Sequence, residues 1–166
     1  MRILLILASL SGNTRELARS ITTHCQHAGH TVDWIDTDGD PAQLIPSQLR
    51  QFGHGWYTLY LFGTWTDNAG LTPFEMKRFI AELVGVIGKP PHVAVFGTGE
   101  TQWGEDYYCG AVHRIARFFN SQFPRLCIEQ MPHGQRHAKE IADWIGRVLA
   151  HIEQTHDDED SSSPQP

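Results

Sequence analysis

Five short, mostly apolar runs alternate along this chain with longer segments whose apolar residues recur at helical spacing. A continuous apolar run such as residues 3–8 is typical of a strand that is buried on both faces of a parallel sheet. The alternation predicts an α/β fold in which helices cover both faces of the sheet and right-handed crossovers join its strands. The predicted strands are 3–8, 31–36, 56–62, 92–96 and 125–130, and the predicted helices are 14–28, 41–51, 73–87, 106–119 and 135–152.

The third of these helices has a recognisable start. We expect Thr72 to be its N-cap, with Pro73 at the first helical position and Glu75 at the third. Its predicted buried face consists of Phe74, Phe79, Ile80, Leu83 and Val84.

Length and composition limit the function classes. The 166 residues suit one domain over 1–152, and the polar, acidic segment 153–166 is predicted to be a disordered tail. The net charge of −6 and the lack of a Lys/Arg cluster argue against nucleic-acid binding, and the apolar runs are too short to span a membrane. We therefore expect a cytoplasmic protein, acting as a monomer.

The cysteines and histidines do not suggest a metal site. Three widely spaced cysteines form no CxxC pair and predict reduced thiols, and we expect Cys109 to be a buried helix residue. The histidines near two predicted helix ends are interpreted as surface residues or as cations at helix C-termini, with no metal ligands among them. They are His24, His27, His30, His133 and His137.

The candidate site lies in the loops that follow strands 1, 3 and 4, because ligands of open α/β sheets bind beyond the carboxyl ends of the strands. The first loop, Ser9-Leu10-Ser11-Gly12-Asn13-Thr14, offers hydroxyls, an amide and backbone N–H groups at a helix N-terminus. These groups suit one phosphate, although an ordinary capped turn is the alternative. The loop has no lysine and no GxxxxGK[ST] motif, which argues against a nucleoside triphosphate.

The other two loops each carry a tryptophan. Trp65 follows the third strand and Trp103 lies beyond the fourth, where each could flank a flat ring system or simply lie at the edge of the core. The Gly97-x-Gly99 segment is no dinucleotide fingerprint, because it follows the fourth strand and Gln102 occupies the place of the third glycine. Two indoles and a phosphate loop together favour a flat aromatic mononucleotide.

These motifs resemble the flavodoxin family. The first loop resembles its phosphate loop, residues 64–67 its first flavin loop, and residues 96–100 with 107–112 its second flavin loop and the following helix. The resemblance covers residues 1–152 and implies a short-chain member, because no long insertion interrupts the fifth strand. It implies a flavodoxin-like sheet of order 2-1-3-4-5 with FMN bound between strands 1 and 3.

The resemblance also implies a role for each matching residue. The phosphate would be held by the first loop, the two tryptophans would flank the flavin, and peptides of the other loops would bond its polar edge. The implied FMN-binding residues are Ser9, Leu10, Ser11, Gly12, Asn13, Thr14, Thr64, Trp65, Thr66, Asp67, Gly70, Thr98, Gly99, Glu100, Trp103 and Tyr107. No catalytic residue and no metal ligand is implied.

The sequence departs from the family pattern at three places. Leu10 replaces a small polar residue, the third loop is longer by about Gly104-Glu105, and Thr66 stands where many members have glycine. A β-branched residue resists a positive φ by ~1 kcal/mol or more. We expect Thr66 to hinder the peptide flip that, in the family, accompanies flavin reduction, and so to make the neutral semiquinone less stable.

The implied function is a low-potential electron carrier. Four acids near the site, Asp67, Glu100, Glu105 and Asp106, would oppose negative charge on the reduced flavin and attract redox partners with basic docking surfaces. Three alternatives stay open. Residues 101–105 resemble a stretch of the flavodoxin-like activators of dimanganese ribonucleotide reductase; an NAD(P)H-dependent FMN reductase would need room over the flavin; and a non-redox module could share the fold.

Overall fold

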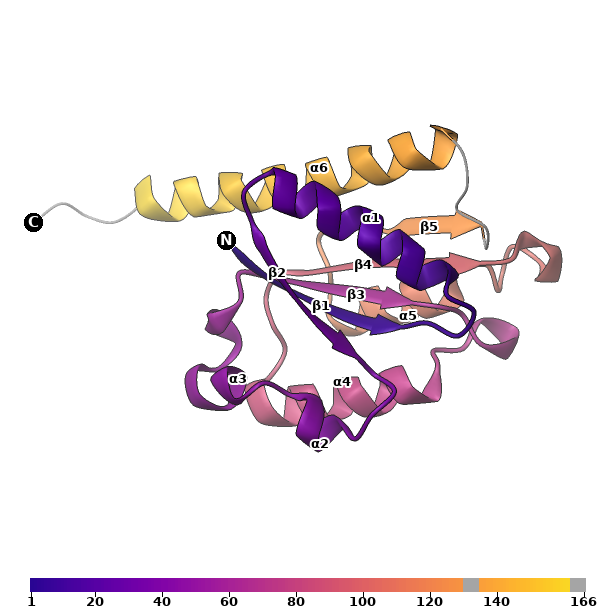
Figure 1. Ribbon diagram of the computed structural model, residues 1–166, viewed down its shortest axis with the longest axis horizontal. Helices are drawn as coiled ribbons and strands as arrows, with labels where there is room; N and C mark the ends of the chain where they lie inside the picture. Colours follow the sequence, from indigo (N-terminus) through magenta and orange to yellow (C-terminus); the bar gives the residue numbers. More distant parts are fainter. Residues whose placement is uncertain (130–134, 162–166) are drawn as a thin grey trace, which may run out of the picture.

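Five parallel strands form the centre of the structure, in the spatial order β2-β1-β3-β4-β5 (Figure 1). This computed structural model describes residues 1–129 and 135–161. The predicted α/β class and the order implied by the resemblance are both confirmed. The strands are β1 (Arg2–Ala8), β2 (Thr31–Asp36), β3 (Leu59–Thr64), β4 (Val93–Gly99) and β5 (Leu126–Glu129).

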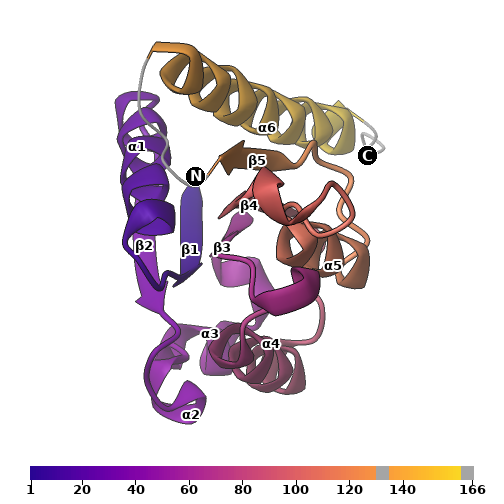
Figure 2. The same cartoon turned by 90° about the vertical axis from the view of Figure 1, so that its right-hand side faces the viewer.

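Helices cover both faces of this sheet. Helices α1 (Asn13–His27) and α6 (Gln135–Ser161) lie on one face, and α4 (Phe74–Ile87) and α5 (Gly110–Phe118) lie on the other (Figures 1 and 2). Two short helices, α2 (Pro41–Leu44) and α3 (Ser47–Phe52), accompany α4 on its face.

The central strand β1 supplies both hydrophobic cores because successive side chains of a strand point to opposite faces. Leu5 and its alternate neighbours pack against α1 and α6, whereas Leu4 and Ile6 pack toward α4 and α5. Each of these side chains is fully buried, and such burial contributes roughly 1.5–3 kcal/mol per residue. The strong apolar run that predicted the fold therefore holds its two helical layers together.

Close packing at the carboxyl end of β4 depends on a glycine. A Cβ atom on Gly97 would meet the carbonyl oxygen of Thr64 on β3, and would lie 2.6 Å from Cγ2 of Val112 on α5. Any larger residue would push α5 and β3 away from β4. Gly97 thus allows the elements that carry the second and third loops to approach one another.

Three element boundaries on the α4 face differ from the prediction. Strand β3 starts at Leu59, because Trp56 belongs to a 3-10 helix (His54–Trp56). The guanidinium carbon of Arg2, on β1, lies 3.8 Å from the centroid of the Trp56 ring. The predicted helix 41–51 is divided at Pro46, since a residue that precedes proline avoids helical dihedrals and Ile45 is extended. Helix α5 starts at Gly110 rather than residue 106, because Cys109 takes a left-handed φ of 49°.

The start of α4 also differs. Pro73 is its N-cap, with an extended ψ of 145°, and no side chain caps the helix, so the prediction of a Thr72 cap is wrong. Phe74 is 71% exposed and lies off the buried face formed by Phe79, Ile80 and Leu83. At the first helical position Phe74 turns away from the sheet, toward the guanidinium of Arg78 at 5.7 Å.

The backbone of α6 continues to Ser161, past the predicted end at residue 152. Extending an established helix requires only one residue to be ordered per hydrogen bond, so an acidic segment can prolong it without apolar contacts. The predicted disordered tail therefore differs from the structure over 153–161. Residues 162–166, His133 and the last residue of the predicted fifth strand lie outside the described residues.

Candidate functional site

Three loops meet at the end of the sheet toward which the strands point, the side that faces the viewer in Figure 2. They follow β1, β3 and β4, as the topology predicted, and they enclose a cavity of about 400 Å³. The cavity is lined by Leu10, Ser11, Trp65, Thr66, Asp67, Asn68, Ala69, Gly70, Thr98, Gly99, Glu100, Trp103 and Tyr107.

Most of the predicted site residues lie on this cavity wall. The predicted residues that the structure does not bring onto the wall are Ser9, Gly12, Asn13, Thr14 and Thr64. Two wall residues, Asn68 and Ala69, were missed by sequence reasoning. Their position between predicted residues Asp67 and Gly70 was the available signal.

The first loop leads into α1 through an N-cap residue that has no side chain. Gly12 is the N-cap residue with φ of 91°, and the hydroxyl oxygen of Ser9 accepts a hydrogen bond of 3.3 Å from the backbone N–H of Arg15. Leu10 is 74% exposed at the mouth of the cavity. A helix N-terminus of this kind attracts anions through its N–H groups and its dipole.

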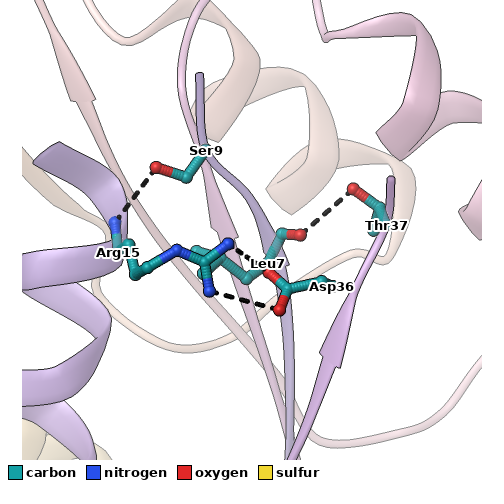
Figure 3. Close-up of polar contacts among 5 residues, drawn as sticks. All are labelled: Leu7, Ser9, Arg15, Asp36 and Thr37. Carbon is teal, nitrogen blue, oxygen red and sulfur yellow. Dashed lines mark hydrogen bonds and ion pairs between the residues drawn. The ribbon is translucent and has the colours of Figure 1, made fainter. Parts of the chain in front are cut away.

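The side chain of Arg15 points away from the loop, toward the end of β2 (Figure 3). Its two terminal nitrogens donate to the carboxylate of Asp36 at 2.6 and 3.2 Å, and this contact raises the pKa of Arg15. Beside it, the hydroxyl of Thr37 donates to the carbonyl oxygen of Leu7 at 3.1 Å (Figure 3). The first turn of α1 is thereby tied to β2, and Asp36 balances the charge of Arg15.

A buried hydroxyl pair joins the first and third loops. The Oγ1 atoms of Thr14 on α1 and Thr98 on β4 are 2.8 Å apart, and the two residues are 1% and 4% exposed. Thr14 and Thr98 are 84 positions apart in the sequence, so this hydrogen bond links the start of α1 directly to the end of β4. This bond fixes the start of α1 against the end of β4, where Thr98 lines the cavity.

The two tryptophans are held differently. The indole N–H of Trp65 donates to the Glu75 carboxylate on α4 at 3.0 Å, and the ring is partly buried against the α4–α5 core. Trp103 is 68% exposed, and its indole N–H donates to Glu100 at 2.6 Å. Gln102 donates to the same Glu100 oxygen. Trp65 is thus fixed by a hydrogen bond to α4, whereas the exposed Trp103 is hydrogen-bonded to a residue of its own loop.

The second loop turns tightly below the cavity. The carboxylate of Asp67 accepts from the N–H of Asn68 at 2.7 Å, and Ala69 and Gly70 take left-handed φ values of 55° and 75°. The guanidinium of Arg114 on α5 donates to the carbonyl oxygen of Gly70 at 3.1 Å. The backbone strain of this loop lies at Ala69, a non-glycine residue, while Thr66 keeps a negative φ.

One buried polar atom on the wall lacks a protein partner. The hydroxyl oxygen of Thr66 makes no hydrogen bond within the described residues, although it is shielded from solvent. Such a group costs free energy unless a ligand or water satisfies it. The wall therefore offers an unused hydrogen-bonding group to whatever binds in the cavity.

Two further properties of the described residues bear on function. Within 1–129 and 135–161, no three His, Cys, Asp or Glu side chains are grouped closely enough to hold a metal ion. In the same ranges, no helix has the length and apolar content that a membrane span requires.

Comparison of the sequence with known proteins identifies relatives along most of the chain. The family model for flavodoxin matches residues 5–144. "Probable flavodoxin 2" of Bacillus subtilis (strain 168) is 29% identical over 155 residues, which cover 90% of this chain and 94% of that protein.

Solved structures share the fold. Oxidised flavodoxins 1 and 2 of Bacillus cereus each superpose with a TM-score of 0.73, at 20% and 24% identity, and each match covers 91% of this chain and 99% of that chain. A Fusobacterium nucleatum flavodoxin, solved bound to flavin mononucleotide, superposes at 0.65 with 12% identity, covering 90% of this chain and 98% of its own. The family match spans most of the sequence and the three loops that line the cavity, and the chain belongs to the flavodoxin family.

Proposed function

We propose that this flavodoxin carries electrons on one non-covalently bound FMN, between a reductase and acceptor proteins with basic docking surfaces. The observation that supports it most is the meeting of three loops, each matching a family motif, around one cavity of about 400 Å³. Bound FMN would supply the reversible uptake of one or two electrons, and the protein supplies binding, orientation and electrostatics.

The first loop suits the phosphate. Ser11 lines the cavity, Gly12 at the N-cap has no side chain to occupy the N–H groups of Asn13 and Thr14, and a Cβ at Gly12 would meet no atom within 4 Å. Because Arg15 is paired with Asp36, the loop would bind the phosphate through N–H groups, hydroxyls and the helix dipole rather than a fixed cation. Ser9 and Thr14 position this loop through their bonds to Arg15 and Thr98.

The second and third loops suit the flavin ring. Trp65 is anchored by Glu75 and would hold one face, while exposed Trp103 would cover the other. The unpartnered hydroxyl of Thr66, with the peptides of Gly99 and Glu100, would satisfy polar atoms at the ring edge. The residues present therefore fit a flat, phosphorylated ring system.

The acids at the cavity set its electrostatics. Asp67 and Glu100 line it, and Glu105 and Asp106 are exposed on the turn that follows Trp103. A carboxylate about 10 Å from added negative charge opposes it by ~1–2 kcal/mol at an effective dielectric near 20, before salt screening. These residues would lower the reduction potential and attract a basic partner.

Electron transfer to a positively charged acceptor tests this function. FMN-loaded protein, reduced by a flavoprotein reductase, should pass electrons to cytochrome c, at a rate that falls as ionic strength rises. The double variant Asp67→Asn/Glu100→Gln should react more slowly and lose part of the salt dependence. Asp143→Asn, which removes one exposed charge from α6 outside the cavity wall, is the control and should leave both nearly unchanged.

The opposite outcomes are equally clear. Oxidation of NAD(P)H by the FMN-loaded protein without any reductase would identify a flavin reductase instead. If the rate of electron transfer changes neither with salt nor in the Asp67→Asn/Glu100→Gln variant, these acidic residues do not dock the partner.

A further inference from the structure

Two of the three cysteines lie together behind the cavity wall, where the carrier function uses neither. Cys127 on β5 is the strand partner of Gly97 on β4. Partnered residues of parallel strands project to the same face of the sheet. A Cβ on Gly97 would meet Val112 of α5, so the thiol of Cys127 also points to the α5 face.

Cys109 approaches the same point from the other side. It is the N-cap residue of α5, it is fully buried, and its sulfur lies 3.9 Å from the carbonyl oxygen of Gly97. The same sulfur lies 3.1 Å from the position that a Cβ on Gly99 would take. Both sulfurs therefore adjoin one short stretch of β4, and both cysteines are free thiols.

The two thiols are chemically unequal. The Cys109 thiol beside it lowers the pKa of Cys127, whereas the same neighbour contact and burial raise the pKa of Cys109. Burial opposes ionisation of Cys127, and of the charged neighbours Arg125 favours it while Glu140 disfavours it. Cys127 is also partly exposed, whereas Cys109 is not. Cys127 is thus the thiol that a reagent in solution reaches first, with Cys109 as its neighbour.

We propose that Cys109 and Cys127 form a redox-active pair that a hydroperoxide oxidises to an intramolecular disulfide. The Cys127 thiolate attacks one peroxide oxygen, the O–O bond breaks, and Cys127 becomes a sulfenic acid as hydroxide leaves and is protonated to water. The Cys109 sulfur then attacks the Cys127 sulfur, which forms the S–S bond and releases the sulfenic oxygen as a second water. Overall, two thiols lose two electrons and two protons to one hydrogen peroxide, giving a disulfide and two waters.

This disulfide would act on the cavity. Gly99 lines the cavity and packs against Cys109, and Tyr107 on the wall is only two residues before it. Joining Cys109 to Cys127 would tie the loop between β4 and α5 to strand β5. Oxidation would therefore restrict the third loop, which carries Trp103.

Thiol mapping on the full-length protein tests this pair. The reduced protein is treated with hydrogen peroxide, blocked with N-ethylmaleimide under denaturing conditions, and analysed by intact mass and peptide mapping. Two of the three thiols should become unreactive, with a Cys109–Cys127 linked peptide that dithiothreitol reverses. Cys25, which is fully buried on α1 with its pKa raised to about 11 by burial, should remain alkylatable.

Two variants decide the assignment. Cys127→Ser, at the partly exposed position, should abolish the linkage, and Cys25→Ser should leave it intact. Four results would each overturn the proposal: a disulfide that includes Cys25, a disulfide between two chains, over-oxidation of Cys127 without a disulfide, or three thiols that all remain alkylatable after peroxide treatment. The thiol count does not depend on bound flavin, so its outcome is independent of the proposed carrier function.

Discussion

The buried threonine pair gives the sharpest quantitative prediction. In Thr98→Val, the hydroxyl of Thr14 loses its partner at a position that is 1% exposed. A buried hydroxyl left unpaired costs about 1–3 kcal/mol, whereas replacing both partners by apolar groups of the same shape is nearly neutral. Thr14→Val and Thr98→Val should therefore each lower the unfolding free energy by about 1–3 kcal/mol.

The double variant should be less destabilised than the sum of the single variants. We expect a coupling free energy of at least about 1 kcal/mol, and a loss of Tm of about 2–4 °C per kcal/mol for a chain of this size. Urea unfolding of the apoprotein, followed by far-UV circular dichroism, measures all the free energies. Thr23→Val is the control, because its hydroxyl donates to the backbone carbonyl oxygen of Arg19 on an exposed helix surface, and it should stay within about 0.5 kcal/mol of the parent.

Additivity would refute this reasoning. If the single-variant losses add to within about 0.3–0.5 kcal/mol in the double variant, the hydroxyls do not interact in solution. The claim that this bond spaces the first and third loops would then fail. Affinity for FMN provides a second readout, because Thr98 lines the cavity and its valine variant should bind FMN less tightly.

Three further outcomes follow from the structure. Gly97→Ala should destabilise the fold by about 1–3 kcal/mol or more, because its Cβ overlaps neighbouring atoms. Gly85→Ala, in open space on α4, should instead stabilise the fold by roughly 0.5–1 kcal/mol, and equal melting temperatures for the two variants would contradict this reasoning. Burial and the N-terminal ammonium lower the pKa of His30 while Glu153 opposes them, so the folded protein favours the neutral ring. The unfolding free energy should therefore fall as pH drops below about 6.5, the unfolded value, toward the folded pKa. His30→Gln should flatten this part of the plot of unfolding free energy, measured with urea, against pH. Thr66→Gly should raise the first one-electron potential of the FMN-loaded protein by about 40 mV, which corresponds to ~1 kcal/mol, and an unchanged redox titration would remove the role given to the β-branched side chain.

The sheet and the location of the site could be predicted because their causes are local or topological. The apolar run of β1 requires burial on both faces, and parallel strands place their carboxyl ends at one edge. That rule alone selected the loops that hold Ser11, Trp65 and Thr98, and all three line the cavity.

The remaining features depend on contacts between distant residues. The hydrogen bond between Thr14 and Thr98 joins residues 84 positions apart, and no local pattern identifies such a partner. Ala69 takes a left-handed φ where the second loop closes. Sequence rules expect that conformation mainly at glycine and asparagine, so they do not predict it at an alanine. Similarly, the Cys109–Cys127 proximity comes from strand pairing between β4 and β5 rather than from cysteine spacing.

Titration of the apoprotein with FMN tests the central claim most directly. The account predicts that one FMN binds per chain, that its fluorescence is quenched by the flanking indoles, and that riboflavin, which lacks the phosphate, binds more weakly. If FMN fluorescence is unchanged at protein excess, or riboflavin binds as tightly as FMN, then these three loops do not form the flavin site.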